Sequence, residues 1–234
     1  MKKIIEKHEV LFSIALIVIY VVTNMICVQN FGEQDFRSVI VNTCFSLLLI
    51  LLIVYLKRVS YYGLKKPINI KECLYFLPLL IIVSVNLYSG ININNSKEEI
   101  IYHILTMINI GFLEEIIFRG FLFKAMAKDN IKSAIIVSAI TFGIGHIVNL
   151  LNGADFIPTM IQIISAISIG YLFVMIFHYS NSLIPCIAAH ALINSLSIFY
   201  QGNNFLLYFT GVILTVIPFI YTMIIKRLNK KVQN

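Results

Sequence analysis

The chain has 234 residues, of which 59% are hydrophobic and only 12% charged, and its mean hydropathy is +0.89. Soluble domains contain about half apolar and about a quarter charged residues, so this composition excludes a soluble globular protein and indicates an integral membrane protein. The net charge of +7 comes from short basic clusters between apolar runs. Such clusters orient membrane proteins, which argues against a nucleic-acid partner.

Apolar runs of about 20 residues, the length that crosses the hydrocarbon core as a helix, recur along the whole chain. No polar block between them is long enough to fold separately, so residues 1–234 are expected to form a single all-α, integral membrane domain. The first run follows lysines as in a signal peptide, but it is long enough to span and no small-residue cleavage site closes it. Eight membrane-spanning helices are expected, at residues 10–28, 38–56, 73–91, 100–127, 132–151, 158–178, 183–200 and 205–225.

The basic residues predict the orientation of these helices. If the helices cross in turn, 16 of the 18 Lys and Arg residues fall on the side of the two termini, and only Arg37 and Lys97 fall on the other. Because cytoplasmic loops carry the excess of Lys and Arg, both termini are expected in the cytoplasm. The many Ile, Asn and Lys residues are typical of an AT-rich bacterial genome, so we expect a multi-pass protein of a bacterial plasma membrane.

The four cysteines lie inside apolar stretches, without the spacing of a zinc site or a disulfide framework. They are expected to be small core residues. They are Cys27, Cys44, Cys73 and Cys186.

Three of the predicted helices carry polar residues that a lipid-facing helix would avoid. An ionisable side chain near the centre of a membrane helix costs about 2.5–3.5 kcal/mol on insertion scales. At about 1.5 Å per residue, four of these groups lie at similar depths, roughly 12–20 Å from the predicted cytoplasmic ends. The polar residues are Glu114, Glu115 and Arg119 in the fourth helix, His146 in the fifth, and His190 and Asn194 in the seventh.

Two interpretations account for these residues. In the structural one, Glu115 and Arg119 stand one helical turn apart as an ion pair, and the histidines bond to neighbouring helices. In the catalytic one, the polar groups share a site. Two carboxylates, two histidines and an amide at one depth favour a shared site, because each added group raises the desolvation cost.

Peptide hydrolysis would use each of these groups. It needs an activated water, a group that carries its proton, and donors aimed at the oxyanion. With Arg119 occupied by Glu115, Glu114 is left free to act as the general base, and His146 would hold the same water. His190 and Asn194, one turn apart, would donate to the oxyanion.

The sequences EEIIFR, FGIGH and HALIN, in this order and on separate helices, resemble the EExxxR, FxxxH and HxxxN/D motifs of one family. This is the CPBP family, the CAAX proteases and bacteriocin-processing intramembrane proteases, which includes the type II CAAX prenyl endopeptidases. The resemblance covers about residues 100–200. It implies an eight-helix intramembrane endopeptidase whose site opens toward the cytoplasmic side.

The resemblance also implies roles for individual residues. By motif position, the catalytic glutamate falls on Glu114 and the water-binding histidine on His146. The pair that stabilises the oxyanion falls on His190 and Asn194. Two further motif residues would support the site: Glu115 and Arg119.

Two mechanisms remain open, because this family is often labelled a metalloprotease. Glu114, His146 and His190 would form a His/His/carboxylate zinc site with water in the open position. If Glu114 were a ligand, another residue such as Glu115 would have to act as the base. No HExxH motif is present and the same groups suffice without a metal, so we favour a mechanism that requires no cofactor.

The CAAX name does not determine the substrate. Bacterial members of the family resemble processors of peptide-pheromone or bacteriocin precursors, or self-immunity proteins, so the expected partner is a membrane-associated peptide or protein. A non-enzymatic immunity or scaffold membrane protein is an alternative. Another is a proton- or ion-coupled transporter, although the repeated halves frequent in transporters are not evident in this sequence.

Overall fold

The computed structural model describes residues 2–66, 77–88, 90–201 and 203–232, and every regular element within them is helical. The elements are α1 (Lys2–Lys7), α2 (Glu9–Phe31), α3 (Phe36–Tyr55), α4 (Leu77–Ser84), η2 (Val85–Leu87), α5 (Lys97–Glu114), η3 (Glu115–Phe123), α6 (Lys124–Met126), α7 (Ile131–Gly145), α8 (Val148–Leu151), α9 (Phe156–Ser180), α10 (Ile184–Ser195), η4 (Leu196–Phe199) and α11 (Asn204–Val232). The expected all-α class is confirmed.

Six helical segments among the described residues are long and apolar enough to cross a membrane. This matches the expectation of a polytopic membrane protein. The segments are Glu9–Phe31, Phe36–Tyr55, Lys97–Met126, Ile131–Leu151, Phe156–Ser180 and Phe205–Asn229.

The other two predicted spans differ from this pattern. The span predicted at 183–200 is a shorter apolar helix, Ile184–Phe199, which starts beside Pro185 and ends in the 3₁₀ turn η4. The span predicted at 73–91 lies partly outside the described residues, together with Cys73, and its described part forms α4 and η2. The predicted count of eight is therefore not confirmed, and the cytoplasmic location of the termini stays a prediction.

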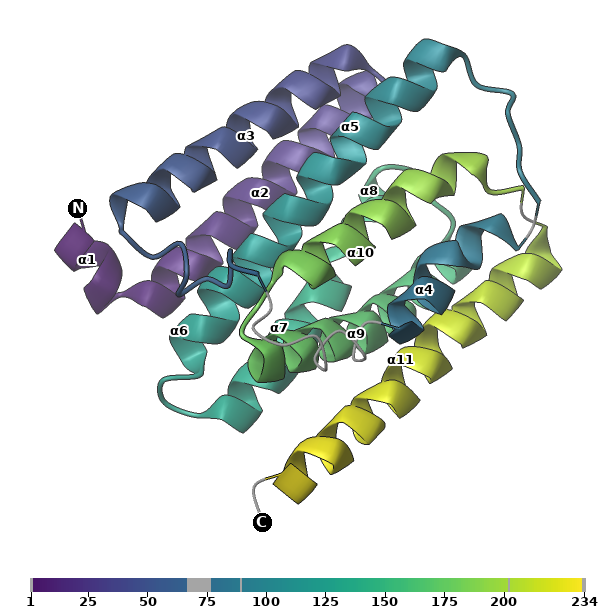
Figure 1. Ribbon diagram of the computed structural model, residues 1–234. Coiled ribbons are helices and arrows are strands. Elements are labelled where there is room, and N and C mark those ends of the chain that lie inside the picture. The colour runs from purple at the N-terminus through teal and green to yellow at the C-terminus, as the bar shows by residue number, and fades with distance from the viewer. Residues whose placement is uncertain (1, 67–76, 89, 202, 233–234) are drawn as a thin grey trace.

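The long helices pack side by side and place their connections at two ends of the bundle (Figure 1). One end holds α1, the α6–α7 turn and the C-terminal part of α11, toward the lower left of the view. We call it the basic end because clusters of Lys and Arg lie within these segments. The opposite end holds the α2–α3 turn and the end of α8, where Gln29 donates to the carbonyl of Leu151.

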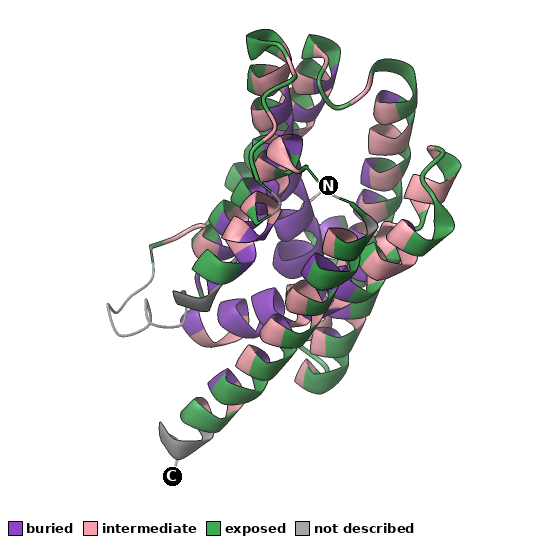
Figure 2. Cartoon of the chain, turned by 90° about the vertical axis from the view of Figure 1, so that its right-hand side faces the viewer, coloured by how far each residue is buried: buried purple, intermediate pink, exposed green. Residues whose placement is uncertain are grey.

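The core is centred on the helix that runs from α5 through η3 to α6. All nine residues of η3 are buried, against α2, α7 and α9. Figure 2 shows buried segments in the interior of the bundle, with exposed positions along the outer faces of the helices. Of the cysteines described, Cys27 and Cys186 are buried and Cys44 is exposed, and all three are free thiols.

Glycine allows two helix pairs to approach closely. A Cβ built on Gly111 would lie 2.8 Å from the backbone nitrogen of Ala191 in α10, and one on Gly143 would lie 2.9 Å from the carbonyl oxygen of Ile163 in α9. Small residues at such crossings are typical of membrane helices. Gly145 makes no such approach, because its nearest neighbour would be 4.0 Å away.

We expect Gly111→Ala to destabilise the protein, because the added methyl group would force α5 and α10 apart. Overpacking of this kind costs about 1–3 kcal/mol of unfolding free energy. Thermal unfolding of the purified protein in detergent micelles measures the change. Gly120→Ala on the same continuous helix is the matched control, since its Cβ would meet its nearest atom at 3.7 Å, an ordinary contact. Equal stability of the two variants would contradict a close α5–α10 contact at Gly111.

Candidate active site

The two glutamates lie where the α-helix α5 changes into the π-helical segment η3. Glu114 is the last residue of α5, and Glu115 is the first residue of η3. π-Helical turns are rare and occur frequently at functional sites. Nothing in the hydrophobic pattern of GFLEEIIFRGFLF indicates this change of helix type.

His190 lies between the two glutamates and connects α10 to this helix. Its Nδ1 is 2.9 Å from Oε1 of Glu115, and its Nε2 is 3.3 Å from Oε2 of Glu114. Both ring nitrogens donate at the same time only when the imidazole carries two protons. The ring also packs edge-on against Phe142, with the centroids 5.5 Å apart. These contacts fix the position and the orientation of the imidazole.

Arg119 is fully buried and approaches the same carboxylate oxygen of Glu115. Its Nη1 lies 3.1 Å from Oε1 of Glu115, which confirms the ion pair expected from the four-residue spacing. The guanidinium carbon lies 4.0 Å from the centroid of the Phe142 ring, a cation–π contact. Glu115 is thus shared between Arg119 and His190, so that buried charges of opposite sign lie together.

Glu114 has a partner that sequence reasoning missed. The hydroxyl of Tyr20, from α2, donates to Oε1 of Glu114 at 2.7 Å, and both side chains are buried. The expectation that Glu114 is left free when Glu115 pairs with Arg119 did not include this bond. Tyrosine is enriched at membrane interfaces, so a tyrosine in the middle of the span Glu9–Phe31 is unusual. This position was the feature of the sequence that could have identified Tyr20.

His146 borders two cavities that meet the site. It follows the last residue of α7, is half-buried, and packs edge-on against Phe142 at 5.4 Å. The smaller cavity, of about 50 Å³, is also lined by Glu114 and Tyr20, and the larger, of about 340 Å³, is also lined by His190. A water needs about 10–15 Å³ of such space, so the smaller cavity has room for one between Glu114 and His146.

Asn194 lines the larger cavity from the same face of α10 as His190. Its backbone carbonyl accepts hydrogen bonds from the hydroxyl of Ser197 at 2.7 Å and lies 3.1 Å from Nε2 of His103. His103 is a buried residue of α5, so this contact fastens the end of α10 to that helix. Sequence reasoning did not single out His103.

The structure thus brings four of the predicted residues into direct contact and places the other two on cavities that reach the site. The residues in contact are Glu114, Glu115, Arg119 and His190; those on the cavities are His146 and Asn194. Their catalytic roles stay predictions. Both ring nitrogens of His190 face carboxylates, so neither is directed freely into the larger cavity. The predicted role of His190 in stabilising the oxyanion therefore requires that one of these contacts is released.

The predicted zinc ligands do not form a metal site. In the described part of the chain, no three His, Cys, Asp or Glu side chains are arranged to hold a metal ion. Of the set Glu114, His146 and His190, the last has both nitrogens engaged by carboxylates. We therefore derive no chemical step through a metal.

Residues 96–196 match the model of a protein family described as Rce1-like, type II CAAX prenyl endopeptidase. The matched segment contains all six polar residues predicted to form the site. This match supports the resemblance of the chain to the CPBP family of CAAX-type proteases. Neither the curated proteins nor the solved structures that were compared with the chain give a match. The matched family implies an intramembrane protease. Tyr20 lies outside the matched segment.

We expect Tyr20→Phe to lower the peptide-cleavage rate of the protein roughly tenfold or more, because a hydrogen bond to a charged group contributes about 1.5–3 kcal/mol. The loss should appear in kcat with KM unchanged, since the hydroxyl holds the carboxylate and lines only the smaller cavity. Steady-state cleavage kinetics in lipid measure both constants. Tyr55→Phe, at an exposed tyrosine of α3, is the control. An unchanged kcat in Tyr20→Phe would show that this bond does not position the base.

Proposed function

We propose that the protein is an intramembrane endopeptidase that hydrolyses a peptide bond of a membrane-associated peptide or protein with a water activated by Glu114. The observation that carries this proposal is the small cavity shared by Glu114 and His146. It offers a place for one water beside a carboxylate and an imidazole. The family supports peptide-bond hydrolysis as the chemistry.

In the first step, Oε2 of Glu114 takes a proton from the water, which His146 orients, while Tyr20 holds the other oxygen. The resulting hydroxide attacks the carbonyl carbon of the peptide bond. The negative charge then moves to the carbonyl oxygen. General base catalysis by a positioned carboxylate typically contributes 10²–10⁴-fold in rate.

The oxyanion would be stabilised by the side-chain amide of Asn194 and by His190. When Glu114 gains a proton it loses its charge, so its contact with Nε2 of His190 weakens. That N–H then becomes available to the oxyanion in the larger cavity. Glu115 keeps its bond to Nδ1 and, together with Arg119, holds the ring in place.

In the last step, Glu114 returns its proton to the leaving amine and the carbon–nitrogen bond breaks. The carboxylate is regenerated. The hydroxyl of the water ends in the new carboxyl group, and its proton ends on the amine. Every proton transfer uses residues of this chain, so the cycle requires no cofactor.

For the substrate, we propose a peptide-pheromone or bacteriocin precursor in a bacterial plasma membrane, or a bacteriocin cleaved in self-immunity. This proposal is supported by the resemblance to the family, whose bacterial members resemble processors of such peptides, and by a residue composition typical of an AT-rich bacterial genome. Two alternatives would use the same residues differently: a non-enzymatic immunity or scaffold protein, and a proton- or ion-coupled transporter. The substitutions below distinguish these alternatives from a protease.

We expect Glu114→Gln to reduce cleavage about 10²–10⁴-fold or below detection, because the amide cannot accept the proton of the water. His146→Ala should also abolish cleavage, since the water loses its second contact. The assay is cleavage of a panel of membrane-associated peptides by purified protein in lipid, with and without a chelator. Glu98→Gln, at an exposed position near the start of α5, is the control.

Activity that survives the chelator would support the metal-free mechanism, and activity lost in the chelator and restored by zinc would overturn it. Cleavage unchanged in both site variants would remove these residues from catalysis. Ion flux abolished by Glu114→Gln would favour a transporter. Peptide binding without any cleavage, intact in Glu114→Gln, would favour a scaffold.

A further inference from the structure

An asparagine within α2 has a side-chain oxygen that the chain does not satisfy. Asn24 lies in the membrane-spanning segment Glu9–Phe31, and its Oδ1 is buried without a hydrogen-bond partner among the described residues. The interior of a membrane offers no bulk water to such a group, so a buried amide oxygen is costly unless it finds a partner. The packing of the described helices does not supply that partner.

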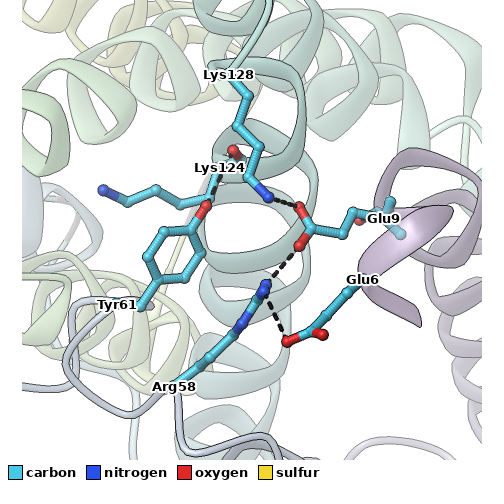
Figure 3. Close-up of polar contacts among 7 residues, drawn as sticks. Glu6, Glu9, Arg58, Tyr61, Lys124 and Lys128 are labelled. Atoms are coloured by element: carbon cyan, nitrogen blue, oxygen red, sulfur yellow. Dashed lines mark hydrogen bonds and ion pairs between the residues drawn. The ribbon is translucent and has the colours of Figure 1, made fainter. Parts of the chain in front are cut away.

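Other polar side chains of α2 bond within the chain. The carboxylate of Glu9, at the start of the helix, lies between Arg58 and Lys128 (Figure 3). The hydroxyl of Tyr20 donates to a carboxylate at 2.7 Å. Polar groups on this helix are thus engaged from one end to its middle, so the open oxygen of Asn24 indicates a different kind of partner.

The smaller cavity of the site brings this oxygen together with the glutamate. Asn24 stands one helical turn after Tyr20 on the same face of α2, and both line this cavity of about 50 Å³. A second oxygen there also lacks a hydrogen bond of good geometry. It is Oε2 of Glu114, which lies 3.3 Å from Nε2 of His190. The cavity therefore joins two buried acceptors that the described residues leave open.

Two acceptors and one imidazole match the hydrogen-bonding capacity of a water molecule. A water can donate one hydrogen to Oε2 of Glu114 and the other to Oδ1 of Asn24. It can accept from a ring N–H of His146, which lines the same cavity. Ordered waters inside proteins typically make about three hydrogen bonds of this kind. The remaining lone pair is then available for attack on a carbonyl carbon.

We propose that Asn24 is a catalytic residue that orients the attacking water, because its Oδ1 accepts the hydrogen that Glu114 does not take. This inference rests on the proposed function and adds to it a residue outside the matched segment, residues 96–196. When Oε2 of Glu114 removes one proton, the O–H that stays on the hydroxide remains bonded to Asn24. The hydroxide oxygen forms the bond to the carbonyl carbon, and the electron pair of the carbonyl double bond moves to the carbonyl oxygen.

This orientation fits the arrangement of the two cavities. They meet at Phe142 and His146, which line both of them. The larger one, of about 340 Å³, has the size of a ligand pocket, whereas the smaller one has the size for water. With both hydrogens held in the smaller cavity, the lone pairs of the water are left for His146 and for a peptide in the larger cavity.

The first test replaces the amide by an apolar side chain of similar size. In Asn24→Leu we expect kcat for peptide cleavage to fall about tenfold, the effect of one lost hydrogen bond, with KM unchanged because the peptide binds elsewhere. Thermal unfolding of this variant should occur at the same or a higher temperature, since an unsatisfied polar group leaves the interior. Asn30→Leu, at an exposed position of the same helix, is the matched control and should retain the wild-type kcat.

Two results would overturn the role of Asn24. A loss of stability that accompanies the loss of kcat would indicate a structural residue, and an unchanged kcat would show that the amide does not hold the water. Glu114→Gln in the same assay separates this inference from the proposed function. Cleavage that survives Glu114→Gln would refute the proposed function, whereas cleavage lost in Glu114→Gln and retained in Asn24→Leu would refute only the role of Asn24.

A second measurement needs no cleavage and no variant. Crystals of the protein grown in lipid, at a resolution that shows ordered water, should contain a water about 2.5–3.0 Å from both Oδ1 of Asn24 and Oε2 of Glu114. Asn24 bonded instead to another group of the protein, or a cavity without this water, would overturn the inference. A protein that cleaves no tested peptide would count against the proposed function, and the crystals would still decide whether Asn24 and Glu114 share a water.

Discussion

The contact of one imidazole with two successive carboxylates determines the arrangement of the rest of the site. His190 reaches Glu114 and Glu115 because α10 lies unusually close to α5 at the next residue, where the backbone of Ala191 faces the missing Cβ of Gly111. A glycine that touches no polar atom of the site therefore sets the distance at which histidine and carboxylate meet. Membrane helices gain little from apolar contact with one another, so close backbone packing of this kind is a principal source of their association.

The buried charges are stabilised by each other and by the aromatic rings around them. Glu115 forms an ion pair with Arg119. The guanidinium nitrogens of Arg119 have no hydrogen bond of good geometry, and the positive charge of the group lies over the face of the Phe142 ring. On the side of the basic end the surroundings are dense and apolar, so electrostatic interactions there are weakly screened. On the other side lie the two cavities lined by His146. The site thus lies at a boundary between solid core and open space, where a carboxylate can be held firmly and still meet a substrate.

The sequence predicted which polar residues lie near one another better than it predicted their contacts. Ionisable groups within apolar runs identified the three helices, and the spacing of Glu115 and Arg119 predicted their pairing, because four residues make about one helical turn. The rotation of each helix is set by tertiary packing, so neither the position of His190 between the glutamates nor the bond from Tyr20 was predictable. The hydrophobic runs at 183–200 and 73–91 predicted spans from length alone, and they do not show where a helix such as α10 begins and ends. The lining of the cavities depends on side chains from α8, α9 and α11, which no motif includes.

The bond from Tyr20 to Glu114 has a consequence for how such proteins diverge. The matched segment, residues 96–196, carries the motifs, whereas the hydroxyl that holds the carboxylate of Glu114 comes from α2, outside it. Exchange of Tyr20 alone would alter the position or the basicity of the Glu114 carboxylate and leave every motif intact. Two chains with identical motifs would then differ in turnover, and a comparison of motifs alone would classify them as equivalent enzymes.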